Sequence, residues 1–146
     1  MKSLAVSLKE MEQLAGEFTG RLLPKKDRAT VVTLSGDLGS GKTTFAKALA
    51  RTFGIEEDVT SPTYVIEKIY IPTKGLFSRL IHIDAYRLKD KHDLDVLGWY
   101  ELLQAPGNLI LLEWPEKVEG AIPSDAIRVS LEFVDEHTRA IKYDLE

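Results

Sequence analysis

The stretch from Gly36 to Thr44 reads Gly-Asp-Leu-Gly-Ser-Gly-Lys-Thr-Thr, with three glycines followed by a lysine and two threonines. Its first eight residues match the spacing G-x-x-x-x-G-K-[ST] in full. Glycines let the backbone curl so that its N–H groups face inward, where they can bind the oxygens of an anion. Because a helix is expected directly after the loop, its unpaired amides and its dipole also favour an anion. The pattern therefore predicts a loop that binds the phosphates of a nucleotide.

Two polar residues of this loop have distinct predicted roles. Lys42 can reach the β- and γ-phosphates as a point charge, and the Thr43 hydroxyl can bind magnesium. A glycine-rich turn that binds nothing is the alternative, but a β-rich run precedes the loop and a helical pattern follows it, as a nucleotide site requires. We therefore predict nucleotide contacts from Gly36, Asp37, Leu38, Gly39, Ser40, Gly41, Lys42, Thr43 and Thr44.

Acidic residues end two of the apolar strands that the sequence predicts. Asp84 follows the run Leu80–Ile83, and Glu113 follows Leu109–Leu112. In open α/β sheets, ligands bind at the carboxyl ends of the strands, the edge at which the glycine-rich loop is also expected. A magnesium–nucleotide site needs a carboxylate there, so both acids are candidates for metal binding or catalysis. The alternative for each acid is a solvated strand end or a helix cap.

Two further segments could lie near the nucleotide. The hydroxyl-rich segment Thr60–Thr63 falls where nucleotide hydrolases carry a phosphate-sensing loop, and we predict that Thr63 contacts the nucleotide. Trp114 follows the second acid directly. Packing near the nucleotide and packing in the core are equal interpretations for this tryptophan.

Three polar residues around Asp84 carry weaker signals. His82 alternates along its strand and fits core packing better than the role of a catalytic base. The pair Tyr86-Arg87 fits a cation near phosphate as well as it fits a surface salt bridge. None of these three is assigned to the site from the sequence.

Length and composition are those of one globular domain. The 146 residues are 44% apolar and 29% charged, with a formal net charge of −4. A stand-alone nucleic-acid-binding domain usually has a basic face, so this balance argues against direct binding of nucleic acid. Without any cysteine, a disulfide framework and a thiolate metal site are excluded. No signal peptide or membrane-spanning run is recognisable, so we expect a cytoplasmic protein without membrane contact.

The rest of the pattern predicts one α/β domain over residues 1–146, with a central mostly parallel sheet, helices packed on it, and antiparallel strands or hairpins. An apolar stripe from residue 8 to residue 22 predicts a helix, and Ser7 and Glu10 occupy capping-box positions at its start. The other expected elements are strands at 29–34, 64–71, 77–83 and 109–112, helices at 42–53 and 94–103, and a hairpin at 127–145 with its loop at 135–138.

Four sequence blocks occur in order along the chain: residues 36–44, Ser-Pro-Thr-Tyr at 61–64, His-Ile-Asp-Ala-Tyr-Arg-Leu at 82–88, and Glu-Trp-Pro-Glu at 113–116. Together they resemble the bacterial TsaE family, formerly YjeE, the ATPase of tRNA threonylcarbamoyladenosine biosynthesis. The first block is shared by many families, whereas the other three in this order are specific. The resemblance covers nearly the whole chain.

The resemblance implies a P-loop α/β fold and slow hydrolysis of ATP with Mg²⁺. It implies that Thr43 and Glu113 bind the magnesium and that Asp84 is needed for activity. It also implies association with TsaD-type and TsaB-type partners, which transfer the threonylcarbamoyl group to tRNA, so tRNA is met only indirectly. Because Met11 stands where a threonine is common, no nucleotide contact is assigned to the N-terminal helix.

Other nucleotide-dependent functions make different demands on the sequence. A small-molecule kinase, the main alternative, needs several arginines around the transferred phosphoryl group. The arginines that follow Lys47, at positions 51, 79, 87, 128 and 139, form no cluster. A GTPase should carry Asn- or Thr-Lys-x-Asp, but the segment 73–76 lacks the aspartate. A scaffold that binds ATP without hydrolysing it remains an open alternative.

Overall fold

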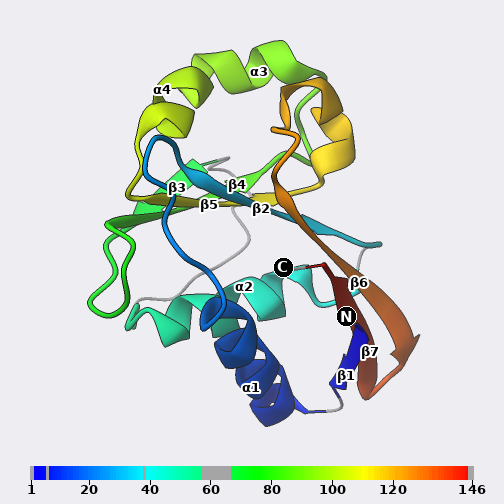
Figure 1. The fold of residues 1–146 in the computed structure, drawn as a ribbon. Coiled ribbons are helices and arrows are strands. Elements are labelled where there is room, and N and C mark those ends of the chain that lie inside the picture. The colour runs from blue at the N-terminus through cyan, green and yellow to red at the C-terminus, as the bar shows by residue number, and fades with distance from the viewer. Residues whose placement is uncertain (1, 6, 38, 57–66, 145–146) are drawn as a thin grey trace.

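Seven strands form one sheet in the part of the chain that the computed structural model describes, namely residues 2–5, 7–37, 39–56 and 67–144 (Figure 1). Their order across the sheet is β1, β7, β6, β2, β5, β4 and β3. The strand bounds are β1 Lys2–Ala5, β2 Thr30–Ser35, β3 Glu67–Tyr70, β4 Arg79–Asp84, β5 Asn108–Glu113, β6 Ile127–Asp135 and β7 Thr138–Tyr143.

Most of the strands point in the same direction. The four central strands, β6, β2, β5 and β4, pair in parallel. The strands β3 and β7 run antiparallel to β4 and β6, and β1 is antiparallel to β7, so β1 again points with the central strands. In register, Glu113 pairs with Asp84 on one side and with Leu34 on the other. The predicted mostly parallel α/β sheet is confirmed, and the carboxyl ends of β2, β4 and β5 meet at one edge.

Helices cover both faces of the sheet (Figure 1). Strand β5 is buried along its whole length, which a strand covered on both faces requires. One core contains Phe18, Phe45 and Leu49 beneath the first two helices, and the other contains Ile81 and Trp99. The helices are α1 Leu8–Thr19, α2 Lys42–Thr52, α3 Lys91–Val96 and α4 Trp99–Gln104, with short 3₁₀ helices η1 Pro115–Lys117 and η2 Glu119–Ala121.

The capping box predicted for the first helix is confirmed. The Glu10 backbone N–H donates to the Ser7 hydroxyl at 3.1 Å, and that hydroxyl donates to the Glu10 carboxylate at 3.2 Å. The first of these bonds satisfies a backbone N–H that a helix start leaves unpaired, and the second holds the two side chains together. The buried side of α1 packs Phe18 against the rings of Phe45 and Tyr143, with centroids 5.8 and 4.9 Å away. This packing fixes α1 beside α2 and the C-terminal strand.

Two elements differ from the sequence-based expectation. The helix expected over residues 94–103 is two short helices, because Gly98 adopts a left-handed backbone conformation (φ 77°) that ends α3 before α4 begins. Strand β1 was not expected, and it pairs with β7 at the edge of the sheet. The C-terminal hairpin was expected, but its turn is tighter, since Asp135 and Thr138 already pair.

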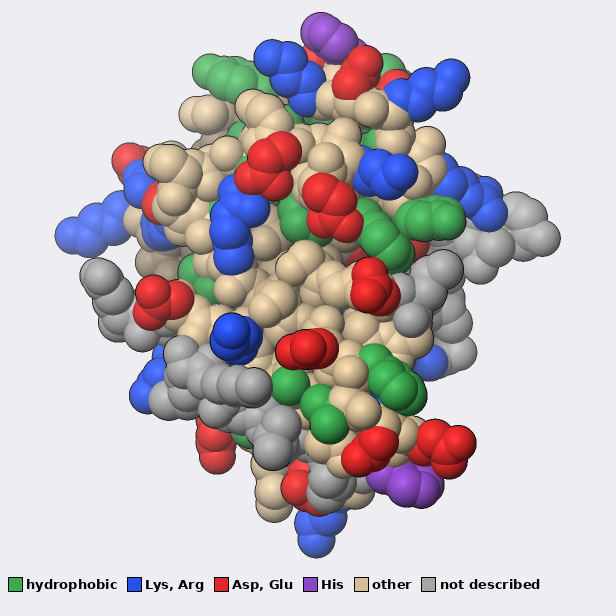
Figure 2. Space-filling view, turned by 90° about the vertical axis from the view of Figure 1, so that its right-hand side faces the viewer, with side chains coloured by type: hydrophobic (Ala, Val, Ile, Leu, Met, Phe, Trp, Pro, Cys, Tyr) green, Lys and Arg blue, Asp and Glu red, His purple; other side chains and the backbone are tan. Residues whose placement is uncertain are grey.

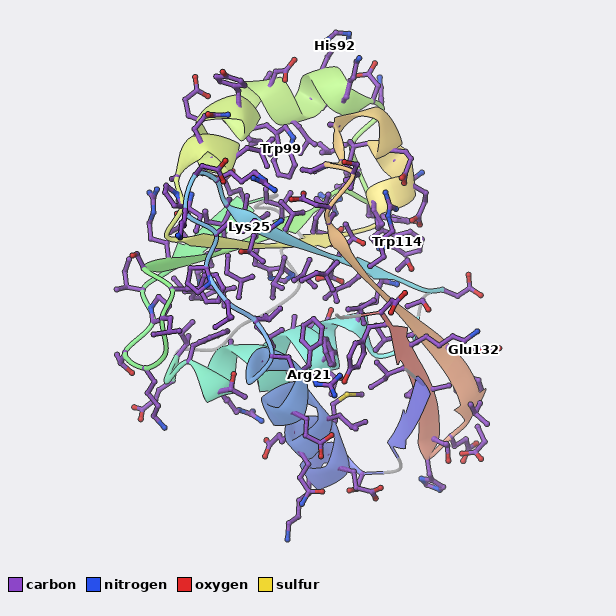
Figure 3. The ribbon with its side chains drawn as sticks, viewed as in Figure 1. Arg21, Lys25, His92, Trp99, Trp114 and Glu132 are labelled. Atoms are coloured by element: carbon purple, nitrogen blue, oxygen red, sulfur yellow. The ribbon has the colours of Figure 1, made fainter. Side chains whose placement is uncertain are left out.

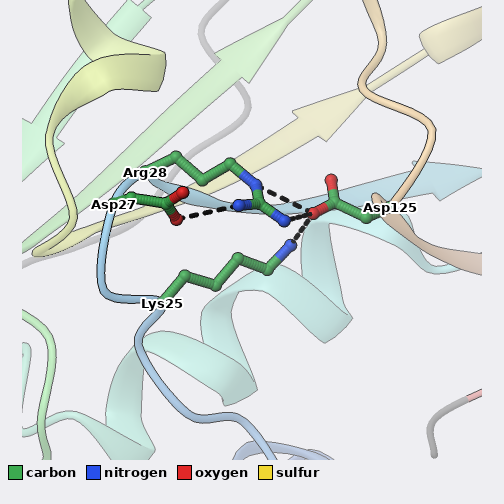
Figure 4. A network of polar contacts seen from close by, with 4 residues as sticks. All are labelled: Lys25, Asp27, Arg28 and Asp125. Carbon is green, nitrogen blue, oxygen red and sulfur yellow. Dashed lines mark hydrogen bonds and ion pairs between the residues drawn. The ribbon is translucent and has the colours of Figure 1, made fainter.

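A cluster of charged side chains ties two surface segments together (Figure 4). One oxygen of Asp125, in the segment before β6, accepts hydrogen bonds from Lys25 and from Arg28 Nε and Nη2, the latter two at 3.0 and 2.5 Å. Arg28 Nη1 also donates to Asp27 at 2.8 Å. The hydrogen bond from Lys25 is the main cause that lowers the pKa of Asp125, with burial opposing it and Arg28 adding to it. This cluster joins the segment that enters β2 to the segment that enters β6.

Candidate phosphate-binding site

The glycine-rich loop, residues 36–41, connects the end of β2 to the start of α2. A Cβ atom on Gly36 would lie 2.3 Å from the backbone oxygen of Leu131 and 2.6 Å from the Ser40 hydroxyl, and Gly36 has φ 145°. Gly41, directly before α2, has φ 100°. Only glycine fits these two positions. The loop therefore keeps the tight curl that its sequence predicts, while Leu38 lies outside the described residues.

Lys42 points back across this loop from the first position of α2. It is buried, and its Nζ donates hydrogen bonds to the carbonyl oxygens of Gly36 and of Asp37, the latter at 3.1 Å. The same carbonyl of Asp37 accepts from the Ser40 backbone N–H at 3.0 Å. The Ser40 hydroxyl is buried and has no hydrogen-bond partner among the residues that the structure describes. Donors and an unpaired hydroxyl thus gather within one turn of chain, which suits an anion with several oxygens.

Four carboxylates surround the Lys42 ammonium. Burial lowers the pKa of Lys42, whereas the charges of Glu113, Glu116, Asp84 and Asp37 raise it. These carboxylates outnumber the ammonium, so the site attracts a cation as well as holding an anion-binding loop. A polyphosphate would enter such surroundings most favourably together with a divalent cation.

Glu113, the last residue of β5, is held from inside the core. Its Oε2 lies 2.5 Å from Nε2 of His82 on the neighbouring strand β4, and only 2% of Glu113 and 1% of His82 is exposed. The other ring nitrogen of His82, Nδ1, is buried and finds no hydrogen-bond partner within the described part of the chain. The strand pattern indicates a packing role for His82 and does not predict this contact. Its signal is the period of two, which puts His82 on the same strand face as Asp84.

Asp84, the last residue of β4, is half-buried beside Glu113. Its Oδ1 accepts a hydrogen bond from the Tyr86 backbone N–H at 3.0 Å, which turns the chain away from the strand. Because β4 and β5 are parallel and pair Asp84 with Glu113, both acids reach the edge that carries the glycine-rich loop. This is the juxtaposition that the sequence predicts for them.

Trp114 contacts both the Lys42 side chain and the second core. It has a left-handed backbone (φ 61°), and its N–H donates to the Leu34 carbonyl at 3.2 Å. The centre of its ring lies 4.0 Å from Nζ of Lys42 and 4.9 Å from the Tyr86 ring, while part of the side chain packs against the second core. Figure 3 shows Trp114 at the edge where β2 ends. The tryptophan is thus both a packing residue and a neighbour of the phosphate loop.

The remaining predicted site residues are distributed as follows. Thr43 is half-buried and Thr44 exposed in the first turn of α2, and Gly39 is exposed in the loop. Arg87 is exposed, and Thr63 lies outside the described residues. Within the described ranges, no group of three or more histidine and acidic side chains could hold a metal by itself. Oxygen donors from Thr43, Glu113 and Asp84 fit magnesium, which commonly completes its coordination with water and phosphate oxygens.

Comparisons with known proteins decide the family. The sequence model of the family described as "Threonylcarbamoyl adenosine biosynthesis protein TsaE" matches residues 5–141. The chain belongs to the TsaE family. The family suggested by the four sequence blocks is therefore confirmed over nearly the whole chain.

Individual proteins of the TsaE family match this chain over similar lengths. The protein named tRNA threonylcarbamoyladenosine biosynthesis protein TsaE of Treponema pallidum is 35% identical over 126 residues, covering 86% of this chain and 87% of its own. The protein of the same name from Rickettsia prowazekii is 35% identical over 134 residues, covering 91% and 87%. The crystal structure of Bacillus subtilis YdiB has a TM-score of 0.76 and 29% identity, covering 99% of this chain and 84% of its own.

TsaE membership and the sheet order together define the fold as that of a P-loop nucleoside triphosphatase, a nucleotide-binding domain. None of the helices in the described residues has the length and apolar character needed to cross a membrane.

Proposed function

We propose that this TsaE-family protein binds ATP together with Mg²⁺ and hydrolyses the ATP in support of tRNA threonylcarbamoyladenosine biosynthesis. The observation that carries the proposal is the position of Glu113 and Asp84 at the sheet edge beside Lys42, close enough for both carboxylates to act on its ammonium. A loop that binds an anion next to acids that attract a cation is the arrangement that magnesium–nucleotide chemistry uses.

The phosphates occupy the glycine-rich loop and the start of α2 in this proposal. The Lys42 ammonium leaves the carbonyl oxygens of Gly36 and Asp37 and binds the β- and γ-phosphates instead. Backbone amides of the loop and of Thr43 and Thr44 supply further donors at the helix start. Charge-assisted contacts of this kind are stronger than the neutral hydrogen bonds that they replace.

Thr43 and Glu113 would hold a magnesium ion, and Asp84 would bind it through water. A magnesium ion bound there would supply positive charge that offsets the negative charge of the phosphate oxygens. His82 orients the Glu113 carboxylate by its hydrogen bond to Oε2. Hydrolysis would form a bond between the γ-phosphorus and a water oxygen, break the bond to the β–γ bridging oxygen, which leaves with ADP, and release a water proton to the solvent. Trp114 and Thr63 complete the nucleotide contacts in this proposal.

Partner proteins connect this reaction to tRNA. We propose TsaD-type and TsaB-type proteins as partners, as the family resemblance implies; the names of the relatives refer to threonylcarbamoyladenosine biosynthesis and so support a role in that pathway. Direct tRNA binding is disfavoured by the formal net charge of −4. Figure 2 shows acidic, basic and hydrophobic side chains interspersed on the side of the molecule that carries the loop edge, a mixed surface better suited to a protein than to a polyanion. We propose a cytoplasmic location for this role.

Phosphate release from purified protein tests the proposal. We expect slow, magnesium-dependent release from ATP, less from GTP because no guanine-reading motif is recognisable, and a changed rate when both partner proteins are added. Comparable hydrolysis of GTP would contradict the ATP preference. Stoichiometric phosphorylation of a small metabolite would establish the kinase alternative, and tight ATP binding without any turnover would establish a scaffold.

A further inference from the structure

An arginine on the C-terminal hairpin contacts the crest of the glycine-rich loop. Nε of Arg139, in β7, donates a hydrogen bond to the carbonyl oxygen of Gly39 at 3.1 Å, although the two residues are 100 positions apart. Nη1 of the same guanidinium donates to the carbonyl oxygens of Asp135 at 2.7 Å and Thr138 at 3.1 Å. The guanidinium carbon also lies 4.6 Å from the centre of the Phe133 ring. One side chain therefore ties the loop to the hairpin turn.

The hairpin contacts the loop at its two ends as well as at its crest. The backbone oxygen of Leu131, in β6, leaves no room for a side chain at Gly36. At Gly41, an added Cβ would lie 3.6 Å from Cγ of Arg139 and 3.7 Å from Cδ2 of Leu131. The strands β6 and β7 thus form an outer wall along the loop, and Arg139 is the charged contact within that wall.

The contact of Arg139 with Gly39 orients the Gly39–Ser40 peptide group, whose N–H could donate to a phosphate. In a trans peptide, the Gly39 carbonyl and the Ser40 N–H point in opposite directions, so a carbonyl held toward the hairpin turns the N–H toward the inside of the loop. That N–H and the Lys42 ammonium both donate to the Asp37 carbonyl. A phosphate oxygen can replace this carbonyl as their acceptor without any rotation of the Gly39–Ser40 peptide.

We propose that Arg139 is a positioning residue that preorganises the glycine-rich loop for phosphate. A guanidinium suits this task because its rigid fork bridges the Gly39 carbonyl and the hairpin carbonyls at once, which a lysine ammonium on a flexible stem does not reproduce. Preorganisation raises affinity because the loop loses less conformational freedom when the ligand binds. The expected effect of Arg139 on nucleotide affinity rests on the proposed function. Its expected effect on the loop without nucleotide does not.

Hydrogen exchange of the nucleotide-free protein tests this restraint of the loop by Arg139, hereafter the clamp, without any ligand. We expect Arg139→Ala to speed amide exchange at Ser40 and Gly41 by roughly tenfold, because the loop opens locally more often. Arg128→Ala is the matched control, since it removes an exposed arginine of β6 that pairs with Glu119 outside the loop. Its loop exchange should equal that of the wild type. Unchanged exchange in Arg139→Ala would overturn the proposal.

Titration with a fluorescent ATP analogue then tests the consequence. We expect Arg139→Ala and Arg139→Lys to bind about tenfold more weakly than wild type, with thermal melts as the folding control. Phe133→Leu, at a half-exposed ring, should shift affinity in the same direction by less. Wild-type affinity in Arg139→Lys would show that only the charge matters and would overturn the clamp. If the wild type binds no nucleotide while exchange still responds, the proposed function fails and the clamp stands.

Discussion

Nε2 of His82, on β4, lies 2.5 Å from Oε2 of Glu113, on β5, and both side chains are almost completely buried. A buried carboxylate needs such a donor, because removing one partner leaves its charge without compensation. The contact also fixes one oxygen of Glu113 toward the core. The contact links His82, for which the strand pattern indicates core packing, to Glu113, the acid that ends the neighbouring strand.

We expect His82→Leu to lower the free energy of unfolding by about 3 kcal/mol, since the Glu113 carboxylate stays buried without its donor. His82→Gln should recover much of this loss, because the amide can still donate to the carboxylate. Urea denaturation followed by circular dichroism measures both changes. Equal stability of the leucine variant and the wild type would show that the hydrogen bond carries no net energy.

Lys42→Ala should weaken ATP binding or turnover by more than about a hundredfold, because charge-assisted contacts to phosphate are the strong ones. The fold should persist, since the ammonium contacts loop carbonyls and the Trp114 ring rather than an apolar core. Arg51→Ala is the control, as it removes an exposed cation at the other end of α2. Unchanged affinity and turnover in Lys42→Ala would refute the phosphate site.

Glu113→Gln should raise the magnesium concentration needed for ATP hydrolysis much more than it disturbs folding. The amide keeps the size of the side chain and an acceptor for His82, but it removes the charge that attracts a hard cation. Asp84→Asn should abolish most activity with a smaller change in magnesium dependence. A magnesium titration of all three proteins, with thermal melts beside it, separates these effects. Wild-type behaviour of Glu113→Gln would leave Asp84 as the metal carboxylate.

Gly36→Ala should destabilise the protein by about 2 kcal/mol or more and abolish nucleotide binding. Its added Cβ would lie 2.3 Å from the Leu131 backbone oxygen, and φ 145° is unfavourable for alanine. Gly16→Ala is the matched control, because Gly16 lies within α1 and its added Cβ would have no atom of the described residues within 4 Å. We expect that change to stabilise by about 0.5–1 kcal/mol in thermal or chemical unfolding. Equal stability of the two variants would contradict the steric argument.

Asp125→Asn should make thermal stability less dependent on pH in the acid range. The pKa of Asp125 is lowered chiefly by the hydrogen bond from Lys25, with a contribution from Arg28. Its stabilisation is therefore present above the unfolded value of about 3.9 and is lost as pH falls through the lower folded value. The variant should melt a few degrees below the wild type near pH 7, and the two should converge as pH falls below the folded pKa of Asp125. Parallel melting curves across this range would contradict the assignment.

Local sequence patterns determined much of the fold and the outline of the site. The curl at Gly36 and Gly41 and the start of α2 depend on residues within eight positions of one another, so the motif alone predicts them. The Ser7 cap is equally local. Asp84 and Glu113 were identified because each ends an apolar run, and parallel strands end at a common edge.

Other relationships depend on which strands become neighbours. The pairing of His82 with Glu113 requires β5 to lie between β2 and β4, and the contact of Arg139 with Gly39 requires the hairpin to extend the sheet beside β2. Strand β1 likewise exists only because β7 offers it an edge. Periodicity reports which face of a strand is apolar, but it does not report which strand lies alongside.

The physical reason is the range of the interactions involved. Backbone sterics and helix capping act within a few residues and are therefore written into short stretches such as the loop around Gly41. Hydrogen bonds between distant side chains form only after burial has selected a strand order and register, because their small net energy cannot choose that order. The sequence by itself thus determined the phosphate loop and the acids at the strand ends, while the tertiary structure decided how His82 and Arg139 support them.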